Sequence, residues 1–173
     1  TALPRIASDL HGLTKLSWVA TSYLITSAIA TPIYGKLGDM FGRKKIFQIA
    51  IGIFLAASML AGLSQTMNQL VLFRALQGIG AGGLMSLVLA IIGDVIPPRQ
   101  RGRYQGYFGA IFGISSVAGP VLGGLFTEHL TWRWIFYINL PLGALAMYLV
   151  STRLHLPAKS HRHKVDYAGA SLL

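Results

Sequence analysis

Arg74 is the residue whose chemistry stands out first, because it interrupts residues 46–93, a stretch that otherwise carries no charged side chain. A guanidinium stays protonated and is a multiple hydrogen-bond donor, so it could make a neighbouring group release its proton more readily. Gly78 and Gly82 follow at spacings of four and share one helical face with Arg74. Small residues at that spacing indicate a close helix contact, which would direct Arg74 toward another helix, with Gln77 on the adjacent face.

A second group of charged residues lies at the two sides of this stretch. Asp39 and Arg43 are four residues apart in the segment 35–45, and Asp94 ends the uncharged run that follows Arg74. An acid at such a place can cap a helix N-terminus or pair with a base, and Arg43 is the expected partner of Asp94. The glycines of the segment, together with Phe41, predict a short loop of defined geometry.

No pattern in the sequence indicates a metal, a nucleotide cofactor or catalysis. The chain has no cysteine, which excludes disulfides and thiolate metal sites. We interpret the tract around His161 and His163 as a solvated basic linker rather than a metal site. Residues 78–83 match G-x-G-x-x-G, but they lie within an apolar run and follow no strand, so a dinucleotide site is not expected. We therefore predict that the protein is not an enzyme.

The composition indicates that the elements positioning these residues lie in a membrane. Hydrophobic residues make up 53% of the 173 residues, charged residues 12%, and the mean hydropathy is +0.57. A soluble domain carries about 25% charged residues. The uncharged runs are 16–35, 46–73, 75–93, 104–127 and 134–152. They lack the alternation of barrel strands, and a helix of about 20 residues crosses a hydrocarbon core of ~30 Å.

The longest run must be divided into parts of two spans. Residues 64–69 are mostly polar and predict a turn, and Pro97 and Pro98 end the span that follows. The fold prediction is therefore an all-α polytopic membrane helix bundle, in which backbone groups are satisfied within each helix. Its five complete spans are expected at about 17–35, 46–63, 70–96, 104–127 and 134–153.

Basic residues are distributed unequally between the two sides of these spans. The side with the excess holds eleven, and the other side holds three, namely Arg5, Lys15 and Arg133. The eleven are Lys36, Arg43, Lys44, Lys45, Arg99, Arg101, Arg103, Arg153, Lys159, Arg162 and Lys164. The positive-inside rule places that side in the cytoplasm of a cell-membrane protein with several spans. The net charge of +10 thus needs no nucleic-acid partner to explain it.

The two ends of the chain look like parts of further spans. Residues 1–4 are typical of the end of a preceding span, and residues 167–173 begin another apolar run. There is no initiator methionine and no signal-peptide pattern. We interpret the chain as a fragment of a longer protein, with a transmembrane bundle over 1–153, a cytoplasmic linker over 154–166 and the start of the next transmembrane helix over 167–173.

Several of these residues form patterns that resemble motifs of the major facilitator superfamily. The pattern of motif A, between helices 2 and 3, is matched by Gly35, Leu37, Asp39, Gly42, Arg43 and Lys44. Motif B, in helix 4, is matched by Arg74, Gln77, Gly78 and Gly80. Motif C, the antiporter motif of helix 5, is matched by Gly106, Gly119, Pro120, Gly123 and Gly124. The segment 132–143 is similar to the helix 5–6 region of the 14-helix drug:proton antiporters, whose helix 7 begins like residues 166–169. Met40 and Ser115 depart from motifs A and C.

The resemblance implies a major facilitator fold in which this chain supplies helices 2–6, with truncated ends of helices 1 and 7. It implies proton-coupled export of small hydrophobic or cationic, drug-like compounds, with the proton as coupling ion and no other cofactor. Motif A, with Asp94 at the same membrane face, would latch the cytoplasmic side against the C-terminal helices of the transporter. Arg74 and Gln77 would take part in proton coupling, and Pro120 would bend helix 5 where its glycines meet a neighbouring helix.

Two alternatives remain open at this point. A proton-coupled metabolite symporter would share the fold, although motif C favours export. Arg74 could also be an anchor whose guanidinium extends to the membrane surface, rather than a charge in an internal cavity or on a proton pathway.

Overall fold

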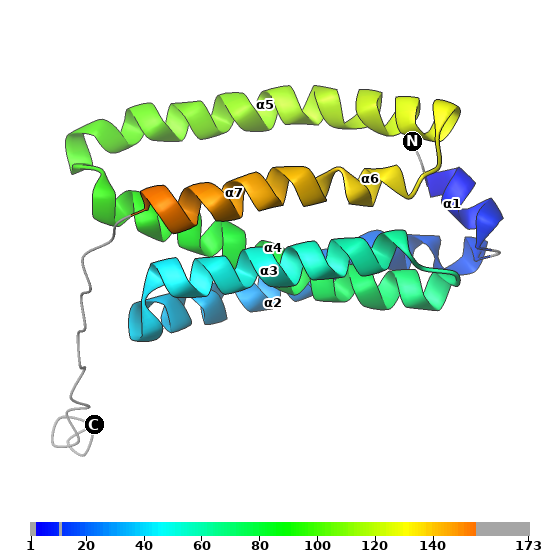
Figure 1. Cartoon of the computed structure of the whole chain (residues 1–173), viewed down its shortest axis with the longest axis horizontal. Helices are drawn as coiled ribbons and strands as arrows, with labels where there is room; N and C mark the ends of the chain where they lie inside the picture. Colours follow the sequence, from blue (N-terminus) through cyan, green and yellow to red (C-terminus); the bar gives the residue numbers. More distant parts are fainter. Residues whose placement is uncertain (1–2, 11, 155–173) are drawn as a thin grey trace, which may run out of the picture.

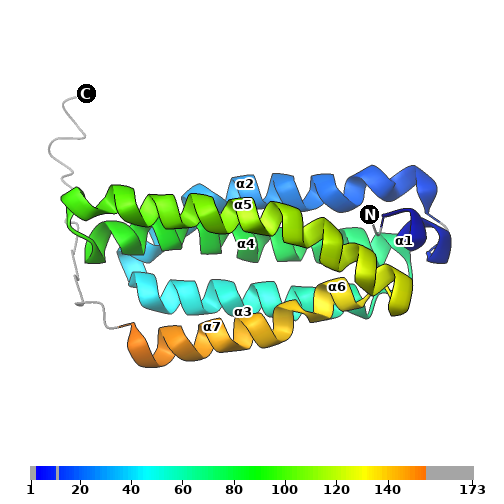
Figure 2. The same cartoon turned by 90° about the horizontal axis from the view of Figure 1, so that it is seen from above.

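The computed structural model describes residues 3–10 and 12–154, and within them it contains helices and no strand. The elements in chain order are α1 (Leu3–Asp9), the 3-10 helix η1 (Leu13–Lys15), α2 (Leu16–Phe41), α3 (Arg43–Gly62), α4 (Met67–Val95), α5 (Pro98–His129), α6 (Trp134–Tyr137) and α7 (Asn139–Arg153). Figures 1 and 2 show the long helices running side by side. The all-α prediction is confirmed for this part of the chain.

Five helical segments among the described residues are long and apolar enough to cross a membrane. They are Leu13–Phe41, Arg43–Gly62, Met67–Val95, Pro98–His129 and Trp134–Arg153. The five predicted spans correspond to them one by one, so the number and order of spans are confirmed. The predicted linker beyond residue 154 and the predicted start of a further helix at 167–173 lie outside the described residues.

The predicted loop at 35–45 is wrong, because α2 continues as a helix to Phe41 and only Gly42 separates it from α3. The prediction placed span ends where charges begin, yet a helix of 26 residues is about 39 Å long and extends past a ~30 Å hydrocarbon core. Gly42 makes the reversal with φ +95°, a conformation that side chains with a Cβ rarely adopt. The defined backbone geometry that was expected of the whole segment is therefore found at Gly42 alone among residues 35–45.

The two ends of the bundle differ in chemistry. At one end lie the α2–α3 and α4–α5 turns and the last turn of α7 (left in Figure 1), and we call it the basic end. Its described basic residues are Lys36, Arg43, Lys44, Lys45, Arg99, Arg101, Arg103 and Arg153. The opposite end, which we call the aromatic end, holds Trp18, Trp132 and Trp134. There the Nε1 of Trp132 donates to the Asp9 carboxylate (2.9 Å) and fixes α1 to the loop before α6.

Helix α4 lies between α2 and α3, and its glycines explain how it contacts both. Gly78 and Gly82 face the backbone of α2, Gly80 faces α3, and Gly83 lies against Ala50 of α3 and Tyr34 of α2. A Cβ at position 80 would lie 2.6 Å from the backbone nitrogen of Phe54. The stripe formed by Arg74, Gly78 and Gly82 therefore faces a neighbouring helix, as the spacing of small residues predicted.

Replacing Gly80 by alanine is expected to destabilise the bundle by about 1–3 kcal/mol, because the new methyl group meets the backbone of α3 rather than a movable side chain. The measurement is thermal unfolding of the purified protein in detergent. Gly52→Ala, on α3, is the matched control, because nothing lies within 4 Å of a Cβ there. The control should be neutral or slightly stabilising, since alanine is the better helix former. Equal unfolding temperatures for the two variants would contradict the close contact.

The last span is broken into α6 and α7 at Ile138. Pro141 has no N–H to donate to the carbonyl of Tyr137, and its ring crowds that carbonyl, so the regular hydrogen-bond ladder stops there. The break leaves Asn139 at the first position of α7 and releases carbonyl groups of α6 for other donors. One of them is used by the site described below.

Helix α5 lies apart from the α2–α3–α4 bundle and is held mainly near its ends (Figure 1). At the basic end Arg101 donates to the carbonyls of Gly93 (2.6 Å) and Ile96 (3.1 Å). At the aromatic end Arg5 donates to the carbonyl of Thr127. The helix is continuous through Pro120, and Figure 2 shows it turning toward α6 in its C-terminal half.

The expectation that the motif C glycines pack against a neighbouring helix stays a prediction, with no such helix in the described part of the chain. Nothing in it lies within 4 Å of a Cβ built at Gly106, Gly119, Gly123 or Gly124. The physical reason is the position of α5, whose central turns have no helix beside them among these residues. Glycine permits the close approach of a neighbouring helix but provides no attraction of its own. The four glycines therefore do not by themselves cause another described helix to pack against α5.

Candidate functional site

Arg74 is held between α2 and α4 by three different contacts. Its Nε donates to the backbone carbonyl of Val19 (3.2 Å), and one terminal nitrogen donates to Oε1 of Gln77 (2.7 Å). The guanidinium lies over the ring of Tyr23, 4.0 Å from the ring centre. Such stacking favours a cation in a site with little water. The interpretation of Arg74 as an anchor extending to the membrane surface does not fit this geometry, since the head group is engaged within the bundle.

No carboxylate forms an ion pair with Arg74 among residues 3–10 and 12–154. The titratable group that faces it there is the Tyr23 phenol. Its other described partners, Gln77 and the Val19 carbonyl, are neutral acceptors. The site thus presents a fixed positive charge that these neighbours leave without a counter-charge.

Gln77 continues the arrangement away from α2 into the rest of the bundle. Its side chain is 2% exposed, and its amide nitrogen donates to Oγ of Ser58 on α3 (3.0 Å). The same Oγ accepts a hydrogen bond from Nδ2 of Asn139 (3.0 Å) and donates to the carbonyl of Phe136 on α6 (2.9 Å). A continuous chain of polar groups therefore runs from α2 through α4 and α3 to the break between α6 and α7.

Tyr23, Ser58 and Asn139 are the members of this site that sequence reasoning missed. The available signal was weak: each is a polar residue without charge inside or at the edge of a predicted span. Many such residues in membrane helices only bond their own helix, as Thr152 does here with the carbonyl of Tyr148. Membership of the site depends on how distant helices are aligned, which spacing along one helix does not reveal.

The charged residues at the basic end form a second arrangement around Arg43. Its NH2 lies 2.8 Å from the Asp39 carboxylate, and its NH1 lies 2.9 Å from the Asp94 carboxylate. The guanidinium also donates to the carbonyl of Ala90 near the C-terminus of α4, where a cation is favoured by the helix dipole. The expected pairing of Arg43 with Asp94 is present. The Asp39 side chain is 63% exposed, so much of its carboxylate is left for other partners.

The neighbouring motif A residues have structural contacts of their own. Lys44 donates to the carbonyl of Ser151 on α7 (2.9 Å), which ties α3 to the last span. A Cβ at Gly35 would lie 3.2 Å from Oγ of Ser86, so Gly35 lies against α4. Gly42 makes the turn described above. The structure therefore brings Gly35, Asp39, Arg43 and Asp94 together at the α2–α4 contact, and it places Lys44 on the opposite side of α3.

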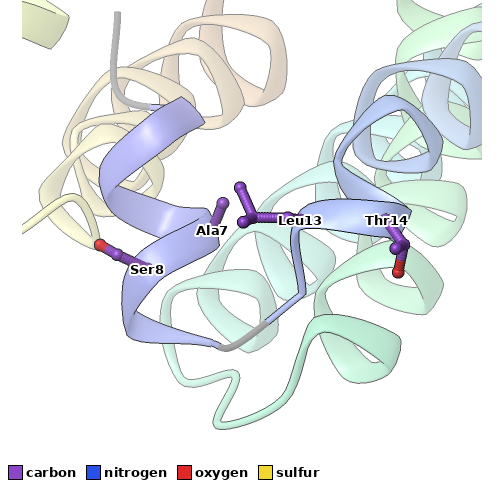
Figure 3. A pocket seen from close by; sticks show the side chains of 4 residues that line it. All are labelled: Ala7, Ser8, Leu13 and Thr14. Atoms are coloured by element: carbon purple, nitrogen blue, oxygen red, sulfur yellow. The ribbon is translucent and has the colours of Figure 1, made fainter.

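The described residues contain no candidate metal site, and the hollow described below does not adjoin the polar groups around Arg74. They contain no group of three or more histidine, aspartate or glutamate side chains that could hold a metal ion. A hollow between α1 and η1 is lined by Ala7, Ser8, Leu13 and Thr14 (Figure 3). Ala7 and Leu13 lie beside each other there, and none of the described residues that line the hollow is charged. It is at the aromatic end, and none of the polar groups around Arg74 contributes to its lining.

The sequence matches the family described as Major Facilitator Superfamily over residues 1–171. A match of this extent, on a chain with five membrane-length helices, defines the class: a multi-pass membrane protein from a family of transporters. The chain belongs to the Major Facilitator Superfamily.

Three of the similar proteins are named as drug or efflux transporters. The chain is 47% identical to Multidrug resistance protein 3 of Bacillus subtilis (strain 168) over all of its own length and 34% of that protein's. It is 43% identical to Multidrug transporter protein MdtP of the same organism, over 98% of the chain and 31% of the relative. It is 40% identical to Efflux pump dotC of Dothistroma septosporum, over 98% of the chain and 30% of the relative. The chain thus spans about a third of the length of the relatives it matches.

Proposed function

We propose that the chain forms part of a proton-coupled exporter of small hydrophobic or cationic compounds. The observation that carries the proposal is Arg74, a permanently charged side chain fixed inside the bundle by Val19, Tyr23 and Gln77. A fixed positive charge favours the deprotonated state of an acid brought near it, which is what a carrier needs to release a proton at one stage of its cycle. Relatives named as multidrug and efflux transporters support export as the direction.

We place the transporter in the cell membrane with its basic end in the cytoplasm. Eleven basic residues are assigned to that side by the sequence, against three on the other. There the exposed face of Asp39 and the Arg43–Asp94 pair would meet the remaining helices of the transporter and latch the cytoplasmic side closed. The glycine face of α5, which is open in this chain, would pack against helices of the same transporter outside it.

The proposal predicts that the full-length transporter containing this sequence exports the lipophilic cation ethidium in exchange for protons. The measurement uses proteoliposomes with an imposed pH gradient, ethidium fluorescence for the substrate and a pH-sensitive dye for the counter-flow. Ethidium should move against the proton flux, and a proton uncoupler should abolish its accumulation. Empty liposomes carrying the same gradient are the control.

Two outcomes of this experiment would contradict the proposal in different ways. Movement of ethidium in the same direction as protons would favour the symporter alternative. Accumulation that persists with the uncoupler present would remove proton coupling and leave only a transporter of small molecules.

A further inference from the structure

We propose that Ser58 is a positioning residue that fixes the Gln77 carboxamide, and through it the Arg74 guanidinium, in the orientation that proton coupling requires. The inference rests on the proposed function and adds to it an uncharged residue on α3 that is connected to Arg74 through the Gln77 side chain. The feature that suggests it is the hydrogen bonding of Ser58 itself. Its Oγ is completely buried and joins groups from three helices other than its own.

The orientation of the Gln77 carboxamide follows from the hydrogen bonds that its two neighbours can make. Arginine can only donate hydrogen bonds, so the group of Gln77 that faces Arg74 must be the oxygen. The amide nitrogen must then point the other way, toward Ser58 at 3.0 Å. A reversed carboxamide would place its N–H groups against the guanidinium. It would also place the Gln77 oxygen against the Ser58 hydroxyl, whose proton is already bonded to the Phe136 carbonyl. The Ser58 contact therefore favours the orientation that Arg74 needs.

The Ser58 hydroxyl uses its whole hydrogen-bonding capacity. It donates its one proton to the Phe136 carbonyl, and it accepts from the amide nitrogens of Gln77 and Asn139. A hydroxyl has one donor and two acceptor sites, so all three are occupied. Because the Phe136 carbonyl accepts the hydrogen bond donated by the hydroxyl, both lone pairs of Ser58 are left directed at the two amides. Among the described residues no buried side-chain polar atom lacks a partner, so the chain of bonds is complete.

The arrangement also joins Arg74 to the break in the last span. Asn139 and Phe136 lie on either side of Ile138, where α6 gives way to α7. A shift of α7 relative to α3 would therefore disturb Ser58, then Gln77 and finally the guanidinium. The ionisable group that faces Arg74 from α2 is Tyr23, and the groups that continue the chain from α3, α6 and α7 are neutral. Effects of Ser58 on proton coupling must consequently pass through Gln77 and Arg74.

The test uses the full-length transporter in proteoliposomes, with ethidium as the probe and a series of pH values. Ser58→Ala removes the hydroxyl, and Ser64→Ala is the matched control. Ser64 is a second serine with no exposed surface, and among the described residues its Oγ bonds the carbonyl of Ala61 in the preceding turn and no group of another helix. At equal protein abundance, Ser58→Ala should lower the exchange rate about tenfold, the effect of losing one well-placed buried hydrogen bond.

The pH dependence separates positioning from a merely structural role. We expect Ser58→Ala to shift the pH profile in the same direction as Gln77→Ala and Arg74→Leu, whereas Ser64→Ala keeps the wild-type profile. Ser58→Thr, which retains the hydroxyl, should restore the wild-type profile even where its extra methyl group lowers abundance. The double variant Ser58→Ala/Gln77→Ala should lose no more than Gln77→Ala alone, because both changes break one connection.

Four results would overturn the inference. A Ser58→Ala protein with reduced abundance but a wild-type rate per molecule and pH profile would make Ser58 purely structural. Additive losses in the double variant would mean that Ser58 acts independently of Gln77. An Arg74→Leu protein with a wild-type pH profile would refute the proposed coupling role of Arg74, and the positioning role of Ser58 with it. A shifted pH profile in Arg74→Leu together with an unshifted profile in Ser58→Ala would reject the positioning role alone.

Discussion

Replacing Arg74 by leucine is expected to remove almost all proton-coupled export while the protein still inserts and accumulates. Leucine has no donor for the Val19 carbonyl or for Oε1 of Gln77, and it cannot stack as a cation on Tyr23. The leucine variant also removes the positive charge that favours release of a proton from an acid brought near it during transport. That acid would then hold its proton to higher pH, so the residual activity should have a pH profile displaced upward.

Arg74→Lys is the matched variant, because it keeps the charge and loses the shape. A lysine ammonium can reach one of the two acceptors. Unlike the planar guanidinium, it cannot stack on an aromatic ring while it donates hydrogen bonds in two fixed directions. We expect partial activity with a pH profile close to the wild type, since the charge is retained. The measurement is ethidium/proton exchange in proteoliposomes across a pH series, normalised to protein content. Full activity in the leucine variant would reduce Arg74 to a packing residue.

Asp39→Asn is expected to abolish export and to leave insertion and thermal stability nearly unchanged. The Asp39 side chain is 63% exposed, and an exposed ion pair contributes only about 0–1 kcal/mol to folding. Arg43 also keeps its contacts with Asp94 and with the Ala90 carbonyl when Asp39 loses its charge. A large loss of transport with normal stability would therefore indicate that Asp39 acts on a partner outside this chain, as a latch between the halves of a transporter requires.

The comparison that sharpens this experiment is Asp9→Asn at the aromatic end. Asp9 accepts a hydrogen bond from Nε1 of Trp132, and the two substitutions remove the same charge from opposite ends of the bundle. Asp9→Asn should retain most of the export, because an amide oxygen can still accept from the indole. Normal ethidium efflux by Asp39→Asn at equal expression would exclude the latch, whatever the control does.

The sequence by itself determined the number and order of the spans, because each depends on a local quantity. An uncharged apolar run of about 20 residues must become a helix when no water is present to bond its backbone. The spacing of Arg74 from Gly78 and Gly82 was also sufficient to direct the guanidinium toward another helix, since helical periodicity puts these residues on one face. The chain contains only five acidic residues, so few carboxylates could pair with Arg43, and Asp94 could be predicted as its partner.

The helix ends were less well determined, and the segment before Gly42 shows why. The charges of Lys36 and Asp39 mark where the chain leaves hydrocarbon, but a helix does not end there if its backbone bonds can continue. The reversal required one residue able to adopt a positive φ, and Gly42 supplies it. Charge patterns report the membrane boundary, whereas backbone conformation decides the boundary of the helix.

The membership of the polar site was decided only by the tertiary structure. Ser58, Gln77 and Asn139 are separated by 19 and by 62 positions, and their contact depends on the vertical alignment of three helices within a few tenths of an ångström. The separation of α5 from the other helices likewise depends on where those helices lie. The glycines of α5 indicated a surface suited to close packing, but they could not show which helix packs there. Hydrophobicity and periodicity act along one helix; hydrogen bonds between helices depend on distances that the packing of all of them sets.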